Sequence, residues 1–294
     1  MVRERLQLKH SVGDTKTNAR VSAGRTGVLP HLARLAREMA TTRGVRGLVT
    51  EGRGLATHIL RYPLGVTPTR IRPNGNGDGP PIDRIHGTPV VLVHGYFHNR
   101  SGFVELTREL RRRGFRWIHG MNYNPIGGSV PDLAERFGRY VDDIRRVSGS
   151  ERVHLVGHSL GGVIARWYVE ELGGHKVVDT CITIGTPHHG TLAAYLGFGQ
   201  AAKDMRPGSD VIQTLEDGLR KRKPTYVNFY SDLDFLIVPP SSALLPEAPN
   251  VHNHLIEDIG HTSLLLSDEL VEQVCAHLEK VERKSRMNRL SATA

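Results

Sequence analysis

One segment of this chain carries the strongest structural signal: Val153-His154-Leu155-Val156-Gly157-His158-Ser159-Leu160-Gly161-Gly162. An apolar run typical of a buried strand leads into a G-x-S-x-G motif, and a helical pattern follows up to Glu171. In a strand–turn–helix of this kind the serine sits at the apex, with its hydroxyl exposed above a sheet. Glycines two residues before and after Ser159 let neighbouring backbone approach so tight a turn. The segment predicts a nucleophilic Ser159; a glycine-rich helix entry with an ordinary serine is the alternative.

Strand-like and helix-like segments alternate on both sides of this motif. The apolar runs predict strands at 89–93, 116–119, 153–156, 177–184 and 225–230, and the periodic segments predict helices at 102–113, 129–146 and from 267 onward. Strands separated by helices in this order predict an α/β protein with a mostly parallel, doubly wound sheet and helices on both faces. Active sites of such sheets lie at the carboxyl ends of strands, where the serine motif also falls.

A serine hydroxyl becomes a nucleophile when a base takes its proton and an acid orients that base. Two carboxylates follow the strand at 225–230, Asp232 and Asp234. Asp234 stands at the front of an apolar run, where its carboxylate could be partly buried against a histidine. We therefore predict Asp234 as the acid, with Asp232 as the alternative, a solvated turn residue if it has no such role.

The base is predicted to be His261, one of 16 histidines in the chain. It lies in a loop just ahead of the last helix, and Gly260 before it lets that loop bend. This gives the chain order serine, acid, histidine that is used by sheets with a G-x-S-x-G turn. His252 and His254 are nearby rivals, but we place them in an earlier loop region, 246–253.

A tetrahedral intermediate on Ser159 would need two backbone N–H donors, each typically worth about 3 kcal/mol of transition-state stabilisation. One is expected from Leu160, the residue after the serine. The other is expected from Tyr96, which follows the strand at 89–93 in the sequence Val93-His94-Gly95-Tyr96. His94 itself is expected to shape this loop rather than to act as a ligand or base.

Taken together, these motifs resemble the bacterial lipases of the α/β-hydrolase superfamily. The resemblance covers roughly residues 86–280 and rests on five stretches: His94-Gly95-Tyr96, Gly157 to Gly162, Gly185-Thr186-Pro187-His188-His189-Gly190-Thr191, Tyr230-Ser231 with Asp234, and Gly260-His261. It implies the α/β-hydrolase fold and a serine carboxylester hydrolase, a lipase or esterase. It also implies a nucleophile at Ser159, an acid at Asp234, a base at His261 and oxyanion donors at Tyr96 and Leu160.

Two features of the resemblance concern the surroundings of the site. The segment 192–224 corresponds to a lid or cap region that could contribute an acyl groove, although a helical core segment is the alternative. Many calcium-binding lipases place an aspartate shortly after the catalytic histidine, whereas Thr262, Ser263 and Leu264 follow here. We therefore expect no calcium at that position and no cofactor. Nor do we expect a metal at His188-His189, because no further ligand lies nearby at the required spacing.

Other functions share these residues. An acyltransferase or a thioesterase would use the same acyl-enzyme and differ in what the acyl group comes from or is passed to. A lipid-binding protein on a retired hydrolase fold is the least favoured alternative, because every part of the predicted machinery is present.

Charge divides the chain into two parts. Residues 1–80 carry 14 Lys and Arg against 5 Asp and Glu, a balance of 14 − 5 = +9, which equals the net charge of the whole chain. We therefore predict a basic, partly helical N-terminal extension at 1–80, with helices at 28–39 and from 50 to 60, where Pro63 would stop the second, and a catalytic domain at 81–294. The glycine- and proline-rich run 73–81 marks the boundary.

The extension has two interpretations. It could contact an anionic membrane peripherally, or it could be a solvated arginine-rich arm that packs on its own domain. Nucleic acid is not favoured, because the segment has few aromatic residues to stack on bases. No apolar run is long enough to span a membrane, and no signal peptide is visible. Cys181 and Cys275 are expected to be buried, reduced thiols, and a single disulfide between them is the alternative. These features predict a cytoplasmic protein.

Overall fold

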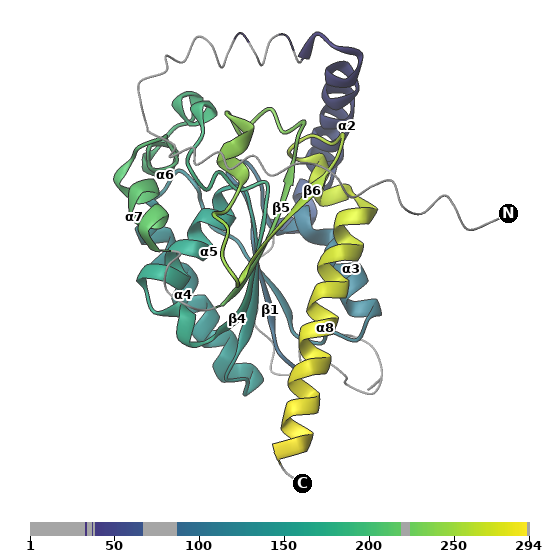
Figure 1. The fold of residues 1–294 in the computed structure, drawn as a ribbon, viewed down its shortest axis with the longest axis vertical. Helices are drawn as coiled ribbons and strands as arrows, with labels where there is room; N and C mark the ends of the chain where they lie inside the picture. The colour runs from purple at the N-terminus through teal and green to yellow at the C-terminus, as the bar shows by residue number, and fades with distance from the viewer. Residues whose placement is uncertain (1–32, 34–36, 38, 67–86, 219–223, 293–294) are drawn as a thin grey trace, which may run out of the picture.

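Six strands form one all-parallel sheet in the part of the chain that the computed structural model describes, residues 33, 37, 39–66, 87–218 and 224–292. The strand order is β2-β1-β3-β4-β5-β6. The strands are β1 (Val90–Val93), β2 (Ile118–Met121), β3 (Val153–His158), β4 (Val178–Ile184), β5 (Thr225–Ser231) and β6 (Val251–Ile256). The predicted parallel, doubly wound sheet is confirmed (Figure 1).

Helices cover both faces of this sheet. They are α2 (Thr42–Gly65), α3 (Val104–Arg112), α4 (Val130–Ser148), α5 (Leu160–Glu171), α6 (Gln200–Asp204), α7 (Asp210–Gly218) and α8 (Asp268–Ala292). Figure 1 shows α4 and α5 on one side of the sheet and α3 and α8 on the other, with α2 at the top of the view. Short 3-10 turns include η1 (Arg100–Phe103), η3 (Leu192–Leu196) and η5 (Ser263–Leu266).

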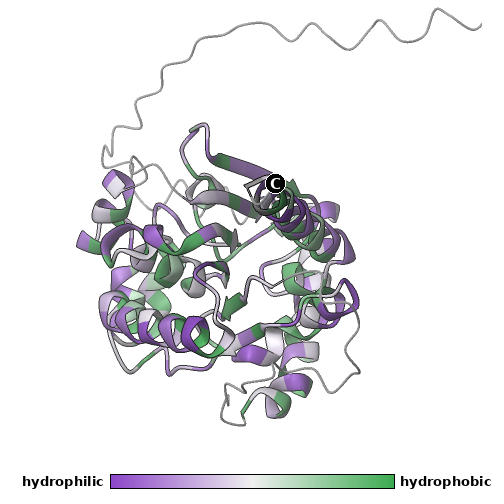
Figure 2. Ribbon diagram, turned by 90° about the horizontal axis from the view of Figure 1, so that it is seen from below, coloured by the Kyte–Doolittle hydropathy of each residue, from purple (hydrophilic) through white to green (hydrophobic). Residues whose placement is uncertain are grey.

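The sheet separates two apolar cores. Successive side chains of a strand point to opposite faces, and β1 shows the consequence. Val91 and Val93 belong to the cluster formed with α4 and α5, whereas Val90 and Leu92 belong to the cluster formed with α3 and α8. Figure 2 shows apolar strands in the middle, between helices that carry polar residues on their outer sides. Burial on both faces explains why β1 reads as an unbroken apolar run.

The long helix α4 begins and ends where its sequence indicates. The Ser129 hydroxyl accepts a hydrogen bond from the Asp132 N–H, and the Asp132 carboxylate accepts one from the Ser129 N–H, which together make a capping box. Pro131 lies in the first turn, where the missing N–H costs nothing. Gly149 ends the helix with φ of 70°, in the left-handed region that favours glycine.

The second helix of the extension is longer than predicted. It begins at Thr42, because the Thr41 hydroxyl caps it by accepting from the Gly44 N–H at 3.0 Å, and it runs to Gly65. Pro63 does not stop it, because a proline φ is helical and only the last turn loses a hydrogen bond. The predicted helix at 28–39 and the linker at 73–81 lie mostly outside the described residues.

The sixth strand was not predicted. The structure places His252 and His254 on β6, so the assignment of the 246–253 region as a loop was wrong for its last residues. β6 is an edge strand that pairs with β5 alone, and residues 252–255 are exposed. A strand exposed in this way lacks the apolar pattern on which the prediction of strands rests.

Candidate active site

Ser159 occupies a sharp turn between β3 and α5. Its backbone has φ of 55° and ψ of −123°, which is rare for a residue other than glycine and is a strained conformation. A Cβ added to Gly157 would lie 2.6 Å from the Gly161 carbonyl oxygen, and one added to Gly161 would lie 2.6 Å from the His94 carbonyl oxygen. Glycine at both positions therefore lets β3, α5 and the loop after β1 converge on the serine.

His261 and Asp234 form a buried hydrogen-bonded pair. His261 Nδ1 lies 2.7 Å from Asp234 Oδ2, and both side chains are almost fully buried. The other carboxylate oxygen of Asp234 accepts the N–H groups of Leu236 and Ile237 at 3.0 and 3.1 Å. Burial alone would lower the pKa of His261, but the charge and hydrogen bond of Asp234 outweigh it, so that pKa is raised above 6.5.

The rival residues lie elsewhere. Asp232 forms an ion pair with Arg43 and accepts the Asp258 N–H at 3.1 Å, which ties it to the N-terminal end of α2. His252 and His254 are exposed on β6. Of the two candidate carboxylates, Asp234 is therefore the one in contact with His261.

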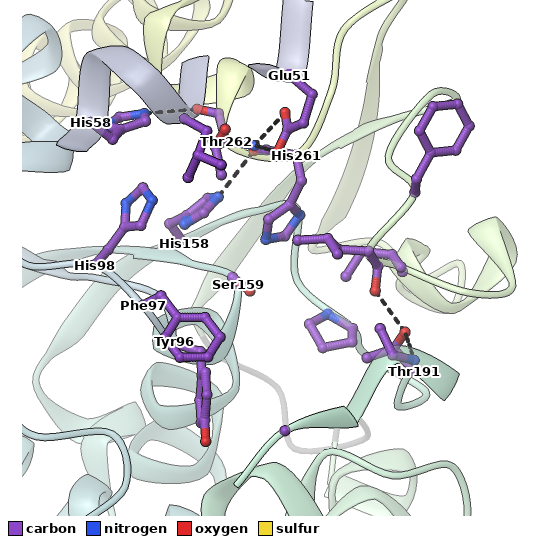
Figure 3. Close-up of a pocket in the computed structure, with 18 of the residues that line it drawn as sticks. Glu51, His58, Tyr96, Phe97, His98, His158, Ser159, Thr191, His261 and Thr262 are labelled. Atoms are coloured by element: carbon purple, nitrogen blue, oxygen red, sulfur yellow. Dashed lines mark hydrogen bonds between the residues drawn. The ribbon is translucent and has the colours of Figure 1, made fainter. Parts of the chain in front are cut away.

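Ser159, His261 and Tyr96 line one cavity of about 520 Å³. Figure 3 shows His261 entering this cavity beside Ser159, with Tyr96 and Phe97 nearby. A Cβ on Gly95 would lie 2.9 Å from Ser159 Cβ, so the backbone just before Tyr96 is packed against the serine. Leu160 is the first residue of α5, where backbone N–H groups have no acceptor within the helix. Both predicted oxyanion donors therefore lie beside the serine in the fold.

His94 is a structural residue of the loop after β1, as expected. Its Nδ1 lies 2.9 Å from the Gly95 carbonyl oxygen, and its ring stacks on Tyr123 with centroids 4.3 Å apart. The Tyr123 hydroxyl donates to the His94 carbonyl oxygen at 2.6 Å. Burial lowers the pKa of His94 to about 4, so this ring is neutral at physiological pH.

The cavity is largely apolar and so is its rim. Its walls include Leu55, Ile59, Phe97, Leu196, Met205 and Leu236. Phe97 is 71% exposed and Leu196 is 83% exposed, so large apolar side chains stand in solvent at the mouth. The Tyr96 hydroxyl accepts the Phe198 N–H at 2.9 Å, which connects the loop after β1 to the segment that follows η3.

The helix α2 is the part of the site that the sequence analysis missed. Its buried positions are Gly44, Gly47, Gly54, His58 and Gly65, whereas its large apolar side chains are exposed or line the cavity. These buried positions are spaced by three, seven, four and seven residues, which places them on one helical face. That glycine spacing was the available signal that the helix packs closely against the rest of the described chain.

The histidines at 188 and 189 are engaged in other contacts. His188 is fully buried, with Nδ1 3.2 Å from Arg166 Nη1 and Nε2 3.1 Å from Thr183 Oγ1, and burial lowers its pKa well below 6.5. His189 lies 2.7 Å from a carboxylate oxygen of Glu216. Within the described ranges, no three His, Cys, Asp or Glu side chains are grouped as a metal ion would require.

Cys181 and Cys275 are buried free thiols, as predicted.

Comparisons with known proteins agree with the fold. Residues 88–208 match the alpha/beta hydrolase fold family. The chain is 28% identical over 107 residues to the lysosomal thioesterase PPT2-B of Xenopus laevis, covering 34% of this chain and 35% of the relative. It is 26% identical over 147 residues to the sn-1-specific diacylglycerol lipase ABHD11 of Danio rerio, covering 46% and 45%. The chain thus spans between a third and a half of the length of these relatives.

A solved structure shows the same fold over a larger region. The mature lipase BlEst2 of Bacillus licheniformis superposes with a TM-score of 0.58 at 18% identity, covering 70% of this chain and 96% of that one. None of the helices in the described part of the chain is long and apolar enough to cross a membrane. The parallel sheet, the serine turn and these matches show that the chain has the α/β-hydrolase fold, and the curated proteins to which it is similar include a thioesterase and a diacylglycerol lipase.

Proposed function

We propose that this protein is a serine carboxylester hydrolase that cleaves lipid or other acyl esters through an acyl-enzyme on Ser159. One observation carries the proposal: a strained serine at the apex of a turn lines one apolar cavity together with His261, and His261 is hydrogen-bonded to the buried Asp234. The raised pKa of His261 supports it, because the charged imidazolium that forms during attack is stabilised by Asp234.

The reaction follows from these positions. Nε2 of His261 takes the Ser159 proton while Nδ1–H donates to Asp234, and Ser159 Oγ attacks the ester carbonyl carbon. The resulting oxyanion accepts the N–H groups of Leu160 and Tyr96. His261 then gives its proton to the leaving alcohol. A water molecule, deprotonated by the same histidine, attacks the acyl-enzyme and releases the carboxylic acid.

The cavity walls favour an apolar acyl group. Leu55 and Ile59 of α2 face the cavity together with Leu196 and Met205, which belong to the predicted cap segment at 192–224. Burying an acyl chain of several carbons there would contribute about 0.8 kcal/mol per methylene. We propose that this segment forms part of the acyl groove.

Thioester hydrolysis is the second candidate, favoured by the likeness to the thioesterase PPT2-B. The acyl-enzyme would be the same, with a thiol as the leaving group, and an acyltransferase would pass the acyl group to an alcohol or a thiol. Hydrolysis rates for matched oxygen esters and thioesters separate the first two, and product analysis with an added alcohol identifies the third. A lipid-binding protein without activity is the least favoured, because it predicts a broken Ser–His–Asp arrangement.

The test is hydrolysis of an ester series from short to long acyl chains by the wild type and by Ser159→Ala. We expect a fall of about 10⁴- to 10⁶-fold in kcat in the variant. The chain length preferred by the wild type distinguishes an esterase from a lipase. Full activity in Ser159→Ala would reject the mechanism, and a folded wild type inactive on every oxygen ester would favour the thioesterase.

We also propose peripheral contact with an anionic membrane. The support is the +9 balance of residues 1–80 together with exposed apolar residues on α2, such as Val49, Ile59 and Leu60. Co-sedimentation with anionic and with zwitterionic vesicles tests it, comparing the full chain with a variant lacking residues 1–38, which keeps α2. Equal binding of the two proteins to anionic vesicles would reject a role for the basic segment.

A further inference from the structure

The loop that carries His261 is held by α2, which precedes the region of family likeness at residues 88–208. Three hydrogen bonds run from the backbone of this loop to one side chain of the helix. The Thr262 N–H lies 3.0 and 2.9 Å from the two carboxylate oxygens of Glu51, and the Ser263 N–H lies 3.3 Å from the second oxygen. Thr262 follows His261 directly, so the Glu51 carboxylate binds the backbone beside the candidate base (Figure 3).

A second residue of α2 bonds to the carbonyl group of the same residue, Thr262. His58 Nε2 lies 3.0 Å from the Thr262 carbonyl oxygen, and the Ser263 hydroxyl donates to the Thr50 carbonyl oxygen at 2.7 Å. The N–H and the C=O of Thr262 are therefore both bonded to the helix. A loop with its backbone bonded on both sides has little freedom to rotate the histidine that precedes it.

Glycines permit this close approach. A Cβ on Gly260 would lie 2.8 Å from Glu51 Cβ, and one on Gly54 would lie 3.1 Å from the Ser263 nitrogen. A side chain at either position would push the helix and the loop apart. Gly260, which suggested only a bending loop in the sequence, is thus also required for contact with Glu51.

We propose that Glu51 is a positioning residue for His261, holding the base through the backbone N–H groups of Thr262 and Ser263. The inference rests on the proposed function, because it assigns Glu51 a role in the reaction of Ser159 and His261. It makes α2 a component of the active site, although nothing in the catalytic motifs refers to that helix.

The charge of Glu51 gives this role a measurable signature. His261 faces Asp234, Glu51 and the imidazole of His158, and beyond His158 the row of rings continues to His98 and His58. Burial lowers the pKa of His58, lowers that of His98 to about 3 and lowers that of His158 well below 6.5, so these rings are neutral where His261 titrates. The carboxylates of Asp234 and Glu51 both raise the pKa of His261.

The experiment is the pH profile of kcat/KM for Glu51→Gln on a water-soluble ester, beside the wild type. The reaction needs neutral His261, so the rate rises with pH to a plateau, with its midpoint at the pKa of that histidine in the free enzyme. We expect a plateau about tenfold lower, because the base is less well placed. We also expect a midpoint at lower pH than in the wild type, because one carboxylate charge is gone.

The control is Glu135→Gln on the exposed side of α4, which removes one charge without touching the site. It should leave plateau and midpoint unchanged. If Glu51→Gln lowers the plateau but keeps the wild-type midpoint, Glu51 only supports the fold. If it shifts the midpoint but keeps the wild-type plateau, Glu51 acts on His261 by charge alone. Either result, or no change in both, would overturn the proposal.

Two further measurements keep the outcome clear. Glu51→Asp keeps the charge on a shorter side chain, so its midpoint should stay close to that of the wild type while its plateau falls; an unchanged plateau counts against the proposal even if Glu51→Gln does not fold. The proton resonance of His261 Nδ1–H follows the same titration by NMR without turnover. The first step is to show that the wild type hydrolyses the ester and that Ser159→Ala does not. This distinguishes failure of the proposed function from failure of the Glu51 proposal.

Discussion

The two halves of the candidate site are built in different ways. The Ser159 turn is made from consecutive residues of β3 and α5, and its shape depends on glycines and on backbone packing. The His261 loop depends on side chains from distant parts of the chain: Asp234, which lies 27 residues before it, and Glu51, which lies 211 residues before Thr262.

This difference determines how each half should respond to mutation. A turn packed this closely against neighbouring backbone tolerates no added atom. A loop held by remote side chains keeps its fold when one contact is removed, but its histidine is then less well oriented. Substitutions in the first half should therefore affect stability and activity together, whereas those in the second should affect activity more than stability.

After the loss expected in Ser159→Ala, the largest effect is expected from the acid of the His261 half. Asp234→Asn should lower kcat by about 10⁴-fold, because an amide no longer stabilises the charged imidazole or selects its tautomer. The matched change Asp232→Asn removes a carboxylate two residues away that binds Arg43 instead, and kcat should stay within about twofold of the wild type. Steady-state rates of both variants on one soluble ester show which carboxylate is the acid. A greater loss in Asp232→Asn than in Asp234→Asn would reverse the assignment.

The next largest effect is expected from a substitution that disturbs the packing of the Ser159 turn. Gly161→Ala places a methyl group against the backbone carbonyls of Val93 and His94, neither of which can move without disturbing β1. We expect a loss of about 1–3 kcal/mol in the free energy of unfolding together with most of the activity. Gly87→Ala, at a glycine with no atom within 4 Å of the added Cβ, is the control. Denaturant unfolding and ester hydrolysis are measured on both variants. If Gly161→Ala is as stable and as active as Gly87→Ala, the turn does not depend on close backbone packing.

The same contrast separates what the sequence predicts from what it leaves open. The turn at Ser159 is local, so a strand pattern, glycines and a helix pattern within 20 residues describe it. Asp234 and His261 each follow a recognisable position along the chain, yet only the fold shows that their side chains lie 2.7 Å apart. The order of the motifs predicts that these two residues pair, but it does not give the distance between them.

Two errors have a common physical cause. The strand β6 was missed because edge residues such as His252 and Asn253 are exposed and carry no apolar alternation. The role of α2 was missed because its buried face consists of glycines and one histidine, which no hydrophobic pattern detects. In both cases the contact is made by backbone or polar atoms, whereas the pattern of a sequence mainly reports apolar side chains.

The smallest effect distinguishes the packed face of α2 from its open face. Gly54→Ala directs a methyl group at Thr262 and Ser263, where its Cβ would lie 3.0 Å from Thr262 Oγ1, whereas Gly52→Ala meets no atom within 4 Å. Both changes raise helix propensity by about 1 kcal/mol. Gly52→Ala should therefore stabilise the protein by about that amount at unchanged kcat/KM.

In Gly54→Ala the contact with the loop offsets the gain in stability, and we expect kcat/KM to fall several-fold because the backbone next to His261 moves. Thermal unfolding and ester hydrolysis of the two variants measure both quantities. If Gly54→Ala is as active and as stable as Gly52→Ala, α2 can shift away from the loop without cost, and the His261 half does not depend on that helix.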